Sequence, residues 1–253
     1  MTSVPVSPLA FTGAFETHVT LAARPDGGVD ELALFAAARG VKFALIMLDR
    51  GRTRSQPMLT VPGEGTLAAQ VEVAGSLSRD LAGAGFRVVR VKVEAAPWNE
   101  DVPAGDAAAV RLGDAMHFEH HVKVVLDNRP GDCPLPALLA RDGARLSRNA
   151  RRRRADGRAE WFATQRCYRV GLLTARSRLD SLVGALANAG WPPVETEREF
   201  VVYDDAPSVD DGWLEGRAEL WKNRGRVTRS AAWPAISGTC RAGRNSVRPR
   251  RSR

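Results

Sequence analysis

The sequence predicts an α+β protein built from two tandem ferredoxin-like units, each with the order β-α-β-β-α-β, related by internal duplication. Three observations predict it. Apolar residues recur with the period of a strand in some segments and with that of a helix in others. Glycines end the helical segments at matched places in the two halves. A short phrase occurs twice, at residues 15–20 (FETHVT) and at residues 118–123 (FEHHVK).

The first unit is expected over residues 11–97. Its two helical segments end at Gly40 and at Ala84-Gly85, and its strands are rich in β-branched and aromatic residues. The expected elements are a strand (15–21), a helix (29–39), two strands (41–48 and 56–61), a helix (66–83) and a strand (86–94).

The second unit is expected over residues 115–210 and repeats this order. Gly143 and Ala189-Gly190 end its two helices. The expected elements are a strand (118–126), a helix (135–141), two strands (144–149 and 161–168), a helix (174–188) and a strand (194–203). Matched landmarks keep a nearly constant spacing, 103 residues from Phe15 to Phe118 and 105 from Gly85 to Gly190. Such spacing predicts a duplication.

Two segments fall outside the repeat. Residues 98–114 contain proline, glycine and small residues, which is typical of a connector. Residues 211–253 form a basic tail that we expect to be disordered, with eleven basic residues and one acidic residue from position 216 onward. The formal net charge of +8 therefore comes from the tail, and residues 1–215 carry −2.

Composition narrows the class of protein. With 253 residues and 44% hydrophobic content, the chain can bury a substantial core. Its three cysteines, Cys133, Cys167 and Cys240, lie far apart and show no zinc-site spacing, which favours a reducing cytoplasm. No apolar run approaches the length of a membrane span, so we expect no membrane association.

Alternation along the repeated strand separates its side chains into two sets. Phe15, Val19 and Leu21 share the face expected under the helices, whereas His18 and Thr20 share the opposite face. The second copy places His121 and Lys123 in the equivalent positions. If the open faces of the two units face each other, one histidine from each half points into a central cleft.

Two imidazoles across a cleft suit acid–base chemistry, because the ordinary histidine pKa is close to neutrality. We therefore expect His18 and His121 to be a catalytic pair. The alternative is that both are structural residues that form hydrogen bonds to neighbours in the sheet. His120 and His121 point to opposite faces, so we expect no metal ion between them, and no cofactor motif is present.

The triplet His18-Val19-Thr20, echoed by His121-Val122-Lys123, resembles the paired His-x-Thr/Ser motifs of the two-histidine phosphoesterase superfamily. The resemblance covers these motifs and the bilobal, duplicated architecture. It implies a metal-free site between two lobes that acts on cyclic phosphates or RNA ends. In this chain Lys123 occupies the place where the motif has a hydroxyl residue.

Other polar residues are candidates for binding the anion, since arginine and lysine hold phosphate oxygens. With Thr20 and Lys123, the candidate substrate-binding residues are Lys92, Arg148 and Arg166. Arg90 and Lys92 match Glu195 and Glu197 of the second unit, which suggests solvated charges on an edge strand or a salt-bridged interface. The arginine-rich loop at residues 150–160 is either a solvated hairpin tip or a phosphate contact.

The function expected from these features is that of a phosphoester- or nucleotide-directed enzyme, a cyclic phosphodiesterase for example. Its substrate would be a phosphorylated small molecule or RNA. The alternative is a non-catalytic module that binds an anionic ligand or nucleic acid, with the basic tail contributing to the contact.

Overall fold

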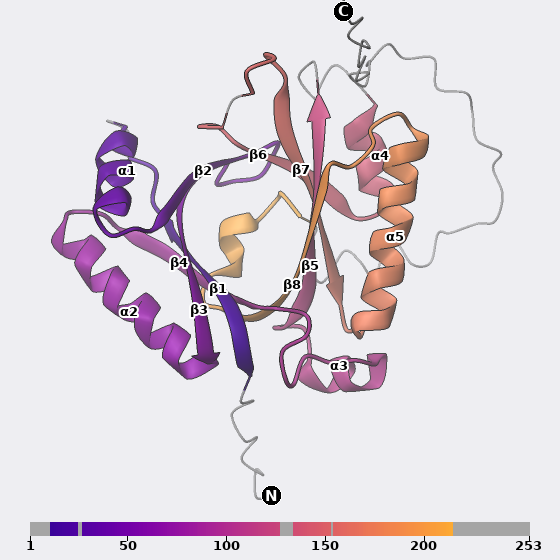
Figure 1. Ribbon diagram of the computed structural model, residues 1–253, viewed down its shortest axis with the longest axis horizontal. Helices are drawn as coiled ribbons and strands as arrows, with labels where there is room; N and C mark the ends of the chain where they lie inside the picture. Colours follow the sequence, from indigo (N-terminus) through magenta and orange to yellow (C-terminus); the bar gives the residue numbers. More distant parts are fainter. Residues whose placement is uncertain (1–10, 25–26, 127–133, 153, 215–253) are drawn as a thin grey trace, which may run out of the picture.

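A computed structural model of the chain describes residues 11–24, 27–126, 134–152 and 154–214 (Figure 1). It is an α+β structure with eight antiparallel strands, and the predicted α+β class is confirmed. Most of the predicted basic tail, from residue 215 onward, lies outside the described residues. Within them, no helix is long and apolar enough to cross a membrane.

The first half follows the predicted order, because its apolar periods match its elements. In the longer helix, Leu77 and Leu81 are one turn apart and both are buried. The elements are β1 (Thr12–Leu21), α1 (Val29–Ala38), β2 (Lys42–Leu48), β3 (Ser55–Thr66), α2 (Leu67–Gly83) and β4 (Val88–Ala95).

The second half repeats this order, as predicted. Its elements are β5 (His117–Leu126), α4 (Leu135–Arg141), β6 (Ala144–Asn149), β7 (Ala159–Tyr168), α5 (Leu172–Asn188) and β8 (Glu195–Asp204). The connector between the halves contains a short helix, α3 (Asp106–Leu112), which the sequence analysis does not predict. A 3-10 turn, η2 (Pro207–Asp210), follows β8.

The eight strands close into one barrel, in the order β1-β3-β2-β6-β7-β5-β8-β4. The sequence analysis expects the open faces of the two units to face each other and does not predict that the two sheets join. Their edges join because β2 pairs with β6 and β4 pairs with β8. Closure satisfies the backbone groups that four edge strands would otherwise leave unpaired. The open faces of both halves thus line the inside of the barrel.

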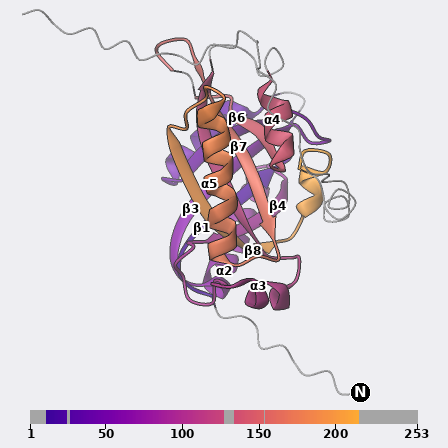
Figure 2. The same cartoon turned by 90° about the vertical axis from the view of Figure 1, so that its right-hand side faces the viewer.

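The apolar cores lie outside the barrel, between the strands and the helices. Helices α1 and α2 cover one side, and α4 and α5 cover the opposite side (Figures 1 and 2). Val19 and Leu81 belong to the first core, and Val124 and Leu182 belong to the second. Because the apolar faces of β1 and β5 point outward to the helices, their polar faces point inward.

The segment after β8 folds back over the barrel instead of leaving it. Trp213 packs with Leu48 and Leu214, and its Nε1 donates a hydrogen bond to the Leu146 carbonyl at 3.0 Å. The boundary predicted at residue 211 is therefore too early. This segment places Asp210, which is 4% exposed, beside the polar interior.

Candidate active site inside the barrel

The repeated strands β1 and β5 place the two histidines inside the barrel. His18 Nδ1 is 3.0 Å from Thr60 Oγ1 on β3, and its Nε2 is 2.5 Å from Glu94 Oε2 on β4. The cross-strand register explains the first contact, because His18 lies directly opposite Thr60.

His121 has the equivalent surroundings in the second half. Its Nδ1 is 3.0 Å from Thr164 Oγ1 on β7. Its Nε2 is 3.3 Å from Glu119 Oε1 and 3.5 Å from Glu199 Oε2. The two halves thus share a histidine, a threonine and a glutamate at matched positions (His18, Thr60 and Glu94; His121, Thr164 and Glu199).

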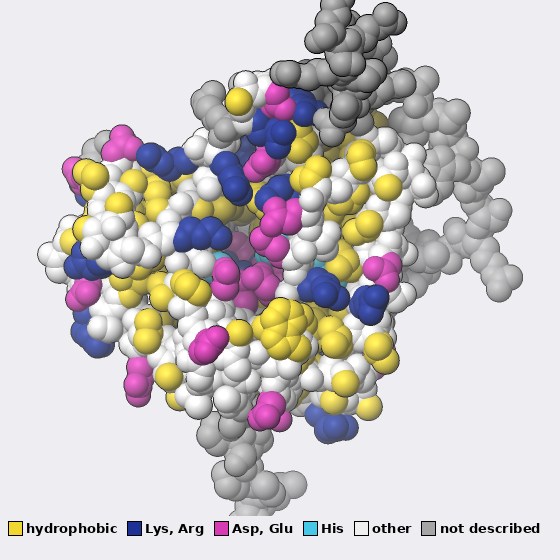
Figure 3. All heavy atoms as spheres, viewed as in Figure 1, with side chains coloured by type: hydrophobic (Ala, Val, Ile, Leu, Met, Phe, Trp, Pro, Cys, Tyr) yellow, Lys and Arg dark blue, Asp and Glu magenta, His cyan; other side chains and the backbone are white. Residues whose placement is uncertain are grey.

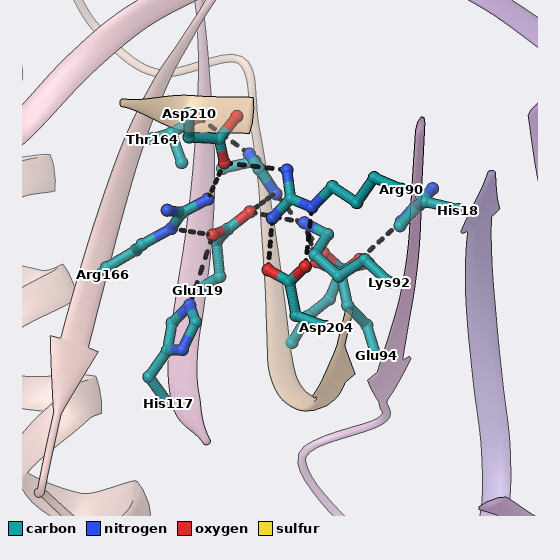
Figure 4. Close-up of polar contacts among 12 residues, drawn as sticks. His18, Arg90, Lys92, Glu94, His117, Glu119, Thr164, Arg166, Asp204 and Asp210 are labelled. Carbon is teal, nitrogen blue, oxygen red and sulfur yellow. Dashed lines mark hydrogen bonds and ion pairs between the residues drawn. The ribbon is translucent and has the colours of Figure 1, made fainter. Parts of the chain in front are cut away.

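Three basic side chains cross the interior, and each binds two carboxylates (Figure 4). Lys92 Nζ is 2.5 Å from Glu94 and 2.9 Å from Glu119. We name the resulting alternation of acidic and basic groups the charge chain. Its members, in order of contact, are Glu94, Lys92, Glu119, Arg166, Asp210, Arg90 and Asp204.

The charge chain sets the protonation of its members. Burial alone would lower the pKa of Lys92, but the Glu119 and Glu94 carboxylates outweigh burial and raise it. Burial alone would raise the pKa of Glu119, but Arg166 and Lys92 hold it well below its usual range. The ammonium of Lys92 and the carboxylate of Glu119 are therefore both charged at neutral pH.

His121 and Glu199 lie beside this chain. Burial alone would lower the pKa of His121, but hydrogen bonds with Glu119 and Glu199 raise it to about 10. Burial, with the nearby charge of Glu94, raises the pKa of Glu199 to about 7. The interior thus holds a cationic imidazole next to a carboxyl that titrates near neutrality.

A pocket of about 670 Å³ opens onto the interior, and Glu16, Glu94 and Glu199 line it. Its other charged wall residues are Glu64, Glu197, Lys42 and Arg198. Figure 3 shows acidic side chains gathered in a hollow on this face of the molecule. With five acidic and two basic side chains, the walls of the pocket favour a neutral or cationic ligand over an anion.

The structure brings most of the candidate residues from the sequence together. His18, His121, Lys92 and Arg166 share the network described above. Thr20 is buried on the same face, directly opposite Arg90 in the register. These placements show proximity, and the catalytic and anion-binding roles stay predictions.

Two candidate residues lie elsewhere. Lys123 pairs with Glu195 on β8 and stacks 5.3 Å over the Phe162 ring. Arg148 lies on the outer face of β6, with its guanidinium 5.6 Å over the Trp161 ring. Adjacent residues of a strand point to opposite faces. Because Ser147 points into the barrel, Arg148 points away from the interior.

The expectation of solvated charges on an edge strand is wrong for Arg90 and Lys92. Both are buried, at 4% and 8% exposed, because β8 covers the edge of β4. The matched Glu195 and Glu197 are exposed, and Glu195 pairs with Lys123. In the arginine-rich loop, Arg151 pairs with Asp30 at 2.7 Å across the surface.

Sequence reasoning missed the carboxylates that complete the site. Glu94 and Glu199 lie 105 residues apart, the same spacing as the glycines that end α2 and α5, so the repeat could have identified them. Asp204 and Asp210 have no counterpart signal in the first half. Asp204 is placed by the pairing of β8 with β4, and Asp210 enters the interior because the end of the chain folds over the barrel.

Two sets of residues in the interior have the composition of a metal site. In each, a histidine and two glutamates offer ligand atoms within 4.8 Å of one another. The sets are Glu16, His18 and Glu199, and Glu119, His121 and Glu94. His120 is in neither set, because it points to the outer face, where its Nδ1 is 3.2 Å from Gln165 Oε1.

No protein-family model matches the sequence, and no curated protein matches it. Among solved structures, the chain is similar to the small subunit of acetolactate synthase from Thermotoga maritima, with 13% identity, a TM-score of 0.29, and coverage of 76% of this chain and 95% of that one. A chlorite dismutase variant from Candidatus Nitrospira defluvii has 10% identity, a TM-score of 0.27, and coverage of 76% and 92%. At these TM-scores the similarities carry no argument about this chain.

Proposed function

We propose that the barrel interior is the active site of an enzyme that acts on a small polar molecule, neutral or positively charged, which enters through the acidic pocket. The observation that supports this is the meeting of two matched sets of histidine, threonine and glutamate beside that pocket. Burying so many ionisable groups costs stability. Such clusters are more typical of active sites than of purely structural cores.

The charge of the substrate follows from the pairing of the basic residues. Lys92, Arg166 and Arg90 each bind two carboxylates, so an entering anion would have to displace these partners. It would also meet the carboxylates of Glu16 and Glu199 in the pocket wall. A neutral or cationic group meets no such opposition.

A panel of matched compounds tests this proposal. Each set contains a primary amine, the corresponding alcohol and the corresponding phosphate monoester on one carbon skeleton, and binding is followed by NMR of the full chain. We expect amines or alcohols to bind at least about 10-fold more tightly than their phosphates, with shifts at pocket residues. A consistent preference for phosphates would overturn the proposal.

A phosphoesterase is the second candidate. It is favoured by one observation, that both predicted histidines lie inside the barrel beside a threonine hydroxyl. The test is hydrolysis of 2′,3′-cyclic nucleotides by the wild type and by His18→Ala and His121→Ala. Activity that both substitutions abolish, in variants that stay folded by circular dichroism, would establish it. Absence of hydrolysis in the wild type would reject it.

Three further expectations are kept as proposals. The matched polar positions support an internal duplication of a ferredoxin-like unit. The free, buried Cys167 fits a cytoplasmic location. Nucleic-acid binding by a non-catalytic module would use the basic tail, so deletion of residues 216–253 should weaken RNA binding and its salt dependence. Unchanged RNA affinity would remove that role.

A further inference from the structure

The two histidine–glutamate sets of the interior are equivalent in the repeat. Glu16 and His18 on β1 correspond to Glu119 and His121 on β5. The third member of each set, Glu199 or Glu94, comes from the last strand of the opposite half. The repeat therefore builds the same arrangement of one imidazole and two carboxylates twice.

The second set already holds a cation. The ammonium group of Lys92 lies 2.9 Å from Glu119 and 2.5 Å from Glu94, and the guanidinium of Arg166 binds Glu119 as well. These contacts compensate the buried charge of both carboxylates. This arrangement shows that the geometry of the set attracts a positive charge and needs no further ion in this half.

The first set lacks these basic residues. At the positions that correspond to Lys92 and Arg166, the chain has Glu197 and Pro62. Within the described part of the chain, Glu16 forms no ion pair, and the charged partner of Glu199 is His121, at 3.5 Å. Two carboxylates and an imidazole thus lie within 4.8 Å of one another, and among the described residues neither carboxylate pairs with a lysine or arginine.

We infer that Glu16, His18 and Glu199 bind a divalent transition-metal ion of the manganese, iron and zinc class. Imidazole nitrogen together with carboxylate oxygen suits these ions better than it suits magnesium or calcium. Three protein ligands also leave coordination positions for water or substrate, as in catalytic metal sites. Glu16 and Glu199 line the pocket, so the ion would meet the substrate there.

This inference rests on the proposed function only for the use of the ion in catalysis. The binding of the ion itself needs no substrate. Metal binding is therefore measured on the full chain alone, and the compound panel above is measured separately, so that either proposal can fail without the other.

The test is calorimetric titration of chelator-treated protein with Mn²⁺ and with Zn²⁺, and the bound metal is counted by mass spectrometry after dialysis. We expect one ion per chain. Glu16→Gln, His18→Asn and Glu199→Gln should each weaken binding at least about 10-fold. Glu64→Gln and Glu197→Gln remove one charge from the same pocket without touching the set, and they should change the affinity less than about 2-fold.

A spectroscopic readout locates the ion even if a variant misfolds. Paramagnetic Mn²⁺ added to the wild type should broaden the ring signals of His18 strongly and those of His120, on the outer face, weakly. Two results would overturn the inference: no binding, or equal loss of affinity in Glu64→Gln and Glu16→Gln.

Discussion

At the scale of single residues, the interior is stable because opposite charges alternate. A buried carboxylate loses its hydration, and this cost is offset only when cations lie within ion-pair distance. Asp210 shows the balance most clearly, because Arg166 lies 2.6 Å and Arg90 2.9 Å from its carboxylate. Its contribution to stability should therefore be large and dependent on pH.

We predict that Asp210→Asn lowers the free energy of unfolding by about 3 kcal/mol or more, because two buried guanidinium groups lose a partner. Urea unfolding at pH 7 measures this change. Asp211→Asn is the matched control: Asp211 is half exposed and lies 4.0 Å from Arg52, so its loss should cost under about 1 kcal/mol. Equal effects of the two substitutions would contradict the prediction.

Asp210 also predicts a loss of stability in acid. Burial alone would raise its pKa, but Arg166 and Arg90 lower it from 3.8 to about 2. A lowered pKa stabilises the folded state above pH 3.8, and this contribution is lost as the pH falls towards 2. The wild type should lose about 2 kcal/mol over this window, and Asp210→Asn should show a correspondingly smaller slope.

His120 on the outer face predicts a second pH dependence. Burial lowers its pKa from 6.5 to about 4, so the folded state keeps the ring neutral. Its contribution to stability is complete above pH 6.5 and is lost as the pH falls to 4. The unfolding free energy should fall by about 3 kcal/mol across this range in the wild type and less in His120→Gln. An unchanged slope in the variant would contradict this.

At the scale of elements, local signals decided where most helices and strands lie. The bounds of these elements were predicted within a few residues from the apolar periods and from the helix stops at Gly40, Gly85, Gly143 and Gly190. The prediction for β3 ended at residue 61 because Pro62 and Gly63 interrupt strands. The strand continues to Thr66 because β1 pairs with it from Met58 to Thr66, which a local pattern does not reveal.

Thr66 ends β3 and also caps α2, and this cap is testable. Its Oγ1 accepts a hydrogen bond from the Ala69 backbone N–H at 3.2 Å. Thr66→Ala should lower the free energy of unfolding by about 1 kcal/mol, because a donor of the first turn loses its partner. Thr66→Ser keeps the hydroxyl and should cost less than half as much. Chemical denaturation compares the two variants.

At the scale of the whole molecule, the connector is packed tightly against the start of α5. The Gly171 N–H donates to Asp106 Oδ1 at 2.8 Å, and a Cβ at Gly171 would lie 2.4 Å from the backbone carbon of Gly105. This contact therefore fixes the connector against the second half.

We predict that Gly171→Ala destabilises the protein by about 2 kcal/mol or more, since backbone must move to admit the methyl group. Gly184→Ala in the same helix is the control, because a Cβ there meets no atom within 4 Å. It should be neutral or stabilise by up to about 1 kcal/mol, as alanine favours a helix. Thermal unfolding of both variants distinguishes these outcomes, and a tolerated Gly171→Ala would contradict the close contact.

The candidate site was predictable only in part. Strand alternation correctly turned His18 and His121 to the polar face, since the period of a strand is a local property. The sequence analysis assigned Arg148 to the site, although this residue lies on the outer face, and it did not recognise Glu94 and Glu199. Their importance depends on which strands become neighbours, and this is a long-range property.

The sequence by itself determined the order of the elements and the face on which each strand residue lies, because these depend on local periodicity and steric preference. The tertiary structure alone decided that the sheets join at their edges and that Lys92 and Arg166 neutralise one histidine–glutamate set but not the other. Those outcomes depend on contacts between residues far apart in the chain, such as Lys92 with Glu119 and Arg166 with Asp210. Barrel closure brings these charges together and excludes water from them. Once water is excluded, the pairing of these charges affects the free energy of folding.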